Sequence, residues 1–117
     1  MTALADRMID GVRRMGSPLC IGLDPFPDRI PALFGDARTD ANAVAAFGEA
    51  IIALAAQHAA VLTQQVGLFE PYGYEGVRVA TELTAVARAV GMTVILDAKR
   101  GDIGTTAEGY ARATLGP

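Results

Sequence analysis

The segment VILDAKRGDIGTT, residues 94–106, joins an apolar run to a dense group of charged residues. The apolar stretch up to Leu96 is typical of a strand buried in a parallel sheet. Asp97, Lys99 and Asp102 follow it within six residues, and the pattern then changes to that of a helix. Strand, polar loop and helix in this order form the repeating unit of a parallel α/β fold. The segment therefore predicts a strand that carries charged side chains at its carboxyl end.

Earlier parts of the chain repeat the same unit. Apolar spacing, prolines, glycines and capping residues predict the following elements: a helix over 3–14, a strand over 19–23, a helix from Thr39 or Asp40 to about His58, a strand over 60–65, a helix over 74–90, a strand over 92–99 and a helix from Thr105 or Thr106 toward Thr114. Three such units predict parallel strands with right-handed crossovers. An open doubly wound sheet and an arc of a (β/α)8 barrel both fit, and periodicity does not choose between them.

Composition limits the classes of function. The chain has 117 residues and a formal charge of −3, without a polybasic segment, so we expect one domain that binds neither nucleic acid nor an anionic membrane surface. The most apolar segment, 43–62, is interrupted by Glu49 and Gln57, which favours a packed helix over a membrane span. We expect a cytoplasmic protein. The single cysteine, Cys20, excludes an internal disulfide framework, and its apolar strand predicts a buried position.

The charged group after Leu96 suits proton transfer to carbon. In a strand, residues two apart point the same way, so Asp97 and Lys99 should share a face, and a turn past Gly101 can bring Asp102 toward the same site or toward a neighbour. Neighbouring carboxylates favour the charged form of a lysine, which suits a general acid that protonates a carbanion. A fixed carboxylate also repels a substrate carboxylate and so favours its loss as carbon dioxide. The alternative is an ordinary ion pair in a surface loop.

Three motifs carry a resemblance to a known family. CIGLDP at 20–25, FEPYGYEG at 69–76 and LDAKRGDIGTTAEGYA at 96–111 resemble the orotidine 5′-phosphate decarboxylase family, most closely its bacterial branch with the DAKRGDIG signature. The resemblance implies a (β/α)8 TIM-barrel fold, of which this chain would hold about the first three βα units and an N-terminal helix. It also implies decarboxylation of orotidine 5′-monophosphate to UMP, without a metal or organic cofactor, by a homodimer.

The resemblance assigns roles to individual residues. Lys99 resembles the proton donor to C6 of the pyrimidine, and Asp97 resembles the carboxylate placed against the departing group. Asp102 resembles the aspartate lent across the dimer interface. Ile103 and Thr106 resemble its neighbours, which contribute to the partner's site. The expected catalytic residues are therefore Lys99, Asp97 and Asp102.

Two residues near the earlier strand ends complete the expected site. Asp24 resembles the residue that holds a ribose hydroxyl. Thr63 stands where family members usually have a lysine, in a VKPQ-like segment that here reads LTQQ, residues 62–65. Without that lysine, Asp24, Asp97 and Asp102 would share one cation, Lys99. Removing one partner from a buried charge network typically costs about 3–5 kcal/mol, so we expect weak or absent decarboxylation.

Chain length adds two alternatives. A (β/α)8 barrel takes about 250 residues, so residues 1–117 are expected to be one domain, the truncated N-terminal part of a barrel. Unpaired sheet edges invite association, which leaves open a non-catalytic part-barrel that folds by self-association. A similar DxKxxD arrangement elsewhere in the superfamily binds magnesium and acts on sugar phosphates, and carboxylates such as these could hold a hard cation.

Overall fold

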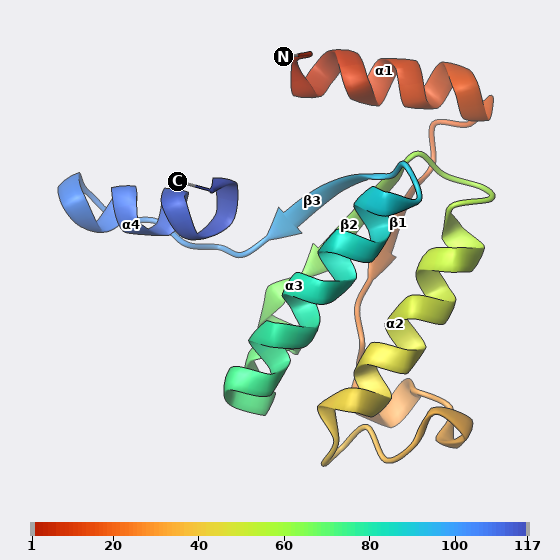
Figure 1. The fold of residues 1–117 in the computed structure, drawn as a ribbon, viewed down its shortest axis with the longest axis vertical. Coiled ribbons are helices and arrows are strands. Elements are labelled where there is room, and N and C mark those ends of the chain that lie inside the picture. The colour runs from red at the N-terminus through yellow and green to blue at the C-terminus, as the bar shows by residue number, and fades with distance from the viewer. Residues whose placement is uncertain (1, 117) are drawn as a thin grey trace.

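A computed structural model describes residues 2–116 (Figure 1). Strands and helices alternate as the sequence predicts, each within a few residues of its expected bounds, except that the last strand ends earlier. The main elements are α1 (Leu4–Met15), β1 (Cys20–Leu23), α2 (Ala41–Ala55), β2 (Val61–Gln65), α3 (Gly73–Ala89), β3 (Thr93–Asp97) and α4 (Gly104–Leu115). Short 3₁₀ turns occupy the loops after β1 and β2, including η3 (Val66–Leu68) and η4 (Glu70–Tyr72).

The three strands form one parallel sheet in the order β1-β2-β3, which confirms the predicted strand direction. Gly22 pairs with Thr63, which pairs with Ile95, and two residues further on Gln65 pairs with Asp97. Helices α2 and α3 lie together on one side of this sheet (Figure 1). This order fits an arc of a barrel and also one half of a doubly wound sheet, so topology alone does not separate the two architectures.

The hydrophobic core lies between the sheet and helices α2 and α3. Strand side chains alternate between faces, and Leu23, Leu62 and Gln64 are fully buried on the helix side. Phe69 from the loop after β2 is also fully buried in the core, with Ile52 of α2 and with Val79 and Leu83 of α3.

The opposite face of the sheet is open among the described residues. The apolar run of β1 predicted a buried position for Cys20, but Cys20 and Gly22 are exposed. The prediction was wrong because an apolar run does not reveal that the two helices cover only one face. The open face is the one on which Thr63, Gln65 and Asp97 lie.

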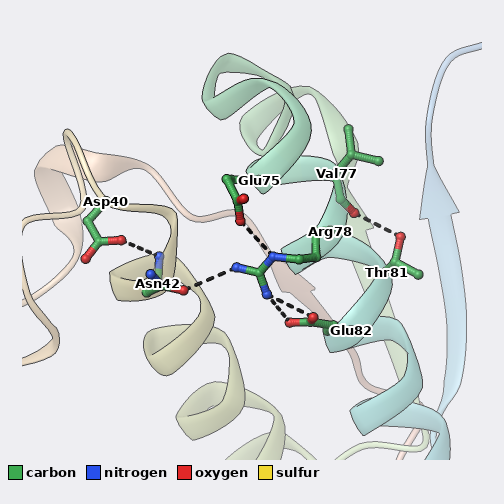
Figure 2. A network of polar contacts seen from close by, with 7 residues as sticks. All are labelled: Asp40, Asn42, Glu75, Val77, Arg78, Thr81 and Glu82. Atoms are coloured by element: carbon green, nitrogen blue, oxygen red, sulfur yellow. Dashed lines mark hydrogen bonds and ion pairs between the residues drawn. The ribbon is translucent and has the colours of Figure 1, made fainter.

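Helices α2 and α3 are joined by close packing and by a polar network (Figure 2). A Cβ atom added to Gly48 would lie 2.4 Å from Cδ1 of Leu83, so the two helices approach closely at this point. Arg78 of α3 pairs with Glu75 and with Glu82, each at 2.7 Å, and it donates to Oδ1 of Asn42 at 3.2 Å. The guanidinium therefore connects two turns of α3 to the first turn of α2.

The helix ends follow the expected chemistry at α2 and depart from it at α4. Asp40 accepts a hydrogen bond from the backbone N–H of Asn42 at 2.8 Å, which confirms one of the two predicted caps. Helix α4 was expected to be capped by Thr105 or Thr106, but its N-cap is Ile103, without a side-chain hydrogen bond. The helix begins one or two residues earlier than predicted because Gly104, with φ of 59°, permits the sharp entry.

Helix α4 stands apart from the α2–α3 layer (Figure 1). None of its residues is buried, and Leu115 is almost fully exposed. Between residues 2 and 116, no helix combines the length and the apolar character needed to cross a bilayer.

Candidate active site

The polar residues of the candidate site gather where the parallel strands end. Asp24 follows the last residue of β1, Thr63 lies within β2, and Asp97 is the last residue of β3. A Cβ atom added to Gly22 would lie 3.4 Å from Oγ1 of Thr63 and 3.6 Å from Oδ2 of Asp24. The Thr63 hydroxyl and the Asp24 carboxylate therefore flank the bare Cα of Gly22 on one face of the sheet, as the alternation of strand residues requires.

The Lys99 ammonium contacts the Asp97 carboxylate, with 2.5 Å between Nζ and Oδ2. The contact was expected from extended geometry, but β3 ends at Asp97 and the backbone of Lys99 is left-handed, with φ of 48°. The long lysine side chain turns back to reach the carboxylate. The hydrogen bond from Lys99 holds the pKa of Asp97 below its ordinary value, against the opposing effect of partial burial.

Gln65 also belongs to this group, although the sequence analysis assigned it no role in the site. Its Nε2 donates a hydrogen bond to Oδ2 of Asp97 at 3.0 Å, and this bond also lowers the pKa of Asp97. Gln65 and Asp97 are register partners at the ends of β2 and β3. A signal was present in the sequence, because equivalent positions at the ends of neighbouring parallel strands lie side by side.

The other predicted site residues lie on or beyond the loop after β3. Asp102 is exposed and accepts a hydrogen bond from the backbone N–H of Ile103 at 2.8 Å. Ile103 is 87% exposed, and Thr106 is exposed in the first turn of α4. We expected three aspartates to share Lys99, but among residues 2–116 only Asp97 pairs with it. The Asp102 carboxylate is instead bonded to the backbone just before α4.

An ion pair connects the two loops that border the site. Arg100, one residue beyond Lys99, pairs with Glu70 in η4, after β2. The pair ties the loop 98–103 to the segment that follows Gln65.

A concavity of about 1200 Å³ opens beside the outer edge of β3, between α1 and α4. Lys99, Arg100 and Asp102 line it, but Asp24, Thr63 and Asp97 do not. The space therefore follows the uncovered edge of β3 rather than the open face that carries the polar group. Within the described residues, no three His, Cys, Asp or Glu side chains are grouped closely enough to hold a metal ion.

Comparison with solved structures decides between the two architectures. A crystal structure from Streptomyces avermitilis, described as an orotidine 5′-phosphate decarboxylase, matches with a TM-score of 0.85 and 34% identity over 97% of this chain and 39% of that one. A Toxoplasma gondii structure, described as an orotidine-monophosphate-decarboxylase, matches with a TM-score of 0.83 and 27% identity over 94% and 36% of the two chains. The protein thus has the α/β architecture of a partial (β/α)8 barrel, which confirms the predicted fold class.

Sequence comparison then identifies the family. The model of the orotidine 5′-phosphate decarboxylase / HUMPS family matches residues 17–116, and the chain belongs to this family. An orotidine 5′-phosphate decarboxylase from Nocardioides sp. is 35% identical over 116 residues, which are 98% of this chain and 38% of that protein. The chain therefore spans less than two fifths of the length of this relative.

Proposed function

We propose that this chain supplies the Asp–Lys part of a site that decarboxylates orotidine 5′-monophosphate to UMP. The observation that carries the proposal is the contact between Lys99 and Asp97 at the carboxyl end of β3, in a chain of this family. Active sites of (β/α)8 barrels are built at that end of the strands. Asp24 and Thr63 lie on the same face and would border the ribose.

The residues would act in one sequence of steps. The substrate carboxylate would lie against Asp97, whose lowered pKa keeps it negative. The bond from C6 to the carboxylate carbon breaks and carbon dioxide leaves. The electron pair of the broken bond remains on C6. Lys99 then transfers one Nζ proton to C6, which gives UMP and a neutral amine that solvent reprotonates. No redox partner is needed, since the electrons of the broken bond end in the new C–H bond.

Because Thr63 carries no positive charge, we expect the proposed site to decarboxylate its substrate only weakly. A lysine there would add a second cation beside Asp24 and near the Asp97 carboxylate, so we expect Thr63→Lys to raise turnover. The test is a chimera of residues 1–117 with the C-terminal remainder of the Nocardioides relative, with and without the substitution. Thr81→Lys is the matched control, because it adds the same charge on the outer face of α3. Equal turnover of all three chimeras would refute this role of position 63.

Titration with a UMP analogue, together with measurement of the oligomer size, tests the site in the chain itself. We expect weak binding that Lys99→Met removes and that Arg112→Met, on exposed α4, leaves unchanged. A defined oligomer without affinity for the analogue would instead favour the non-catalytic part-barrel. Activity that appears only with added magnesium would favour the sugar-phosphate reaction.

Self-association is part of the same proposal. Ile103 and Thr106 are exposed, and Ile103 presents a large apolar side chain to solvent. This exposure supports the family pattern in which both residues, with Asp102, reach the site of a second subunit of a homodimer. Cytoplasmic location stays a prediction from the composition of the chain.

A further inference from the structure

Asp97 receives two hydrogen bonds, and both end on the same oxygen. Lys99 Nζ lies 2.5 Å from Oδ2, and Gln65 Nε2 lies 3.0 Å from the same atom. Among the described residues, no hydrogen bond ends on Oδ1. These donors therefore hold the carboxylate by one oxygen only.

The two donors differ in rigidity. Lys99 is 69% exposed in its side chain, lies in a loop, and has a long stem that could follow either carboxylate oxygen as the group rotates. Gln65 is the last residue of the central strand and is half-buried, and it pairs in register with Asp97. Only Gln65 approaches Asp97 from a fixed point of the sheet.

The neighbouring glutamine shows what a purely structural role looks like in this strand. Gln64 points to the opposite face and is fully buried. Its Nε2 donates to the backbone oxygen of Ala80 at 2.8 Å, and its Oε1 accepts a hydrogen bond from the Thr84 hydroxyl. Its bonds join β2 to α3 inside the core. Gln65 makes no such contact, since its amide is directed along the open face to Asp97.

We propose that Gln65 is a positioning residue, which fixes the rotation of the Asp97 carboxylate so that Oδ2 stays on Lys99 and Oδ1 faces the substrate carboxylate. This inference rests on the proposed decarboxylase function. A carboxylate that rotates freely would spend part of its time with the wrong oxygen toward Lys99. Small losses of such alignment lower rates without weakening binding to the same extent.

NMR titration tests the hold directly and needs no substrate. In the wild-type chain, the side-chain NH₂ resonances of Gln65 should shift with the same midpoint as the Asp97 carboxyl carbon. In Gln65→Met the pKa of Asp97 should rise, because a donor to the charged form is lost. Gln57→Met is the matched control, since Gln57 donates to the backbone oxygen of Ala53 at the end of α2 and the pKa of Asp97 should stay unchanged.

Three results of these titrations would overturn the positioning role of Gln65. An Asp97 titration that is the same in Gln65→Met as in the wild type would overturn the proposal, and so would a shift of equal size in Gln57→Met. If Gln65→Met does not fold, the NH₂ titration of the wild-type chain decides instead, and resonances that ignore Asp97 would overturn the proposal.

Turnover separates this inference from the proposed function. In the chimera described above, Gln65→Met should lower kcat by up to about a hundredfold with little change in KM. Unchanged kcat would overturn the positioning role. If Gln65→Met shifts the Asp97 titration but the wild-type chain does not bind a UMP analogue, the proposed function fails, while the hold of Gln65 on Asp97 stands.

Discussion

Gly76 provides the sharpest test of the packing that supports the site. It lies in the first turns of α3, where a Cβ atom would be 1.8 Å from the backbone oxygen of Phe69 and 2.8 Å from its carbonyl carbon. Phe69 is fully buried and comes just before Glu70, which pairs with Arg100. Gly76→Ala must therefore move a backbone segment on which the loop after β2 depends.

The magnitude follows from the size of this overlap. An ordinary contact between carbon and oxygen is about 3.3 Å or longer, so α3 and the Phe69 carbonyl must separate by roughly 1 Å or more. Overpacking typically costs about 1–3 kcal/mol, and we expect the upper end because the obstacle is backbone rather than a flexible side chain. Replacing glycine by alanine within a helix stabilises the fold by about 0.5–1 kcal/mol, which offsets part of this cost. The net loss for Gly76→Ala is about 2 kcal/mol, or roughly 8 °C in Tm.

Equilibrium unfolding in urea measures this loss, with Gly109→Ala as the matched control. Gly109 lies inside exposed α4, and a Cβ there would have no heavy atom within 4 Å, so only the helix-propensity gain should remain. Gly76→Ala should lower the unfolding midpoint, and Gly109→Ala should leave it equal or slightly higher. A Gly76→Ala chain as stable as the wild type would show that the close approach of α3 to Phe69 does not limit the fold.

Three further predictions concern charged and titrating groups. Because the pKa of Asp97 is lowered, its ion pair with Lys99 stabilises the fold above the ordinary carboxyl value of 3.8 and is lost as pH falls below it; the difference in Tm between wild type and Asp97→Asn should therefore shrink in acid. Burial raises the pKa of Tyr72, so the neutral hydroxyl stabilises the fold below its ordinary pKa of 10.0, and this contribution is lost as pH rises further. The Tm of Tyr72→Phe should therefore fall less at alkaline pH than the Tm of the wild type. Arg78→Ala should lower Tm more than Arg112→Ala, because Arg78 connects α2 to α3 whereas Arg112 pairs only within α4; equal changes would contradict the role of the inter-helix contact.

Much of the fold was predictable because local patterns and the architecture agree. Apolar runs and caps such as Asp40 located the strands and helices and indicated their parallel arrangement. Two features were not predictable from these local patterns, and only the family resemblance indicated the barrel. The exposure of Cys20 depends on which face of the sheet the helices cover, and the choice between a barrel and a doubly wound sheet depends on strands beyond the third. Neither is encoded in the periodicity of a single element.

The candidate site also has features that the sequence predicted and features that it did not. The contact of Asp97 with Lys99 followed from their spacing, although the left-handed backbone of Lys99 did not. The hydrogen bond from Gln65 depends on register between two strands, and it joins residues that are 32 apart in the chain. The separation of Asp102 from Lys99 depends on the path of the loop through Gly101, and glycine leaves that path open.

The backbone of Lys99 has a consequence for engineering. A left-handed conformation costs an ordinary residue about 1–2 kcal/mol, and asparagine or glycine tolerates it better. A search for thermostable variants would therefore favour asparagine at position 99, and with it would remove the proposed proton donor. Stability and the proposed proton transfer make opposite demands on this one residue, so selection for heat resistance alone should act against the proposed chemistry.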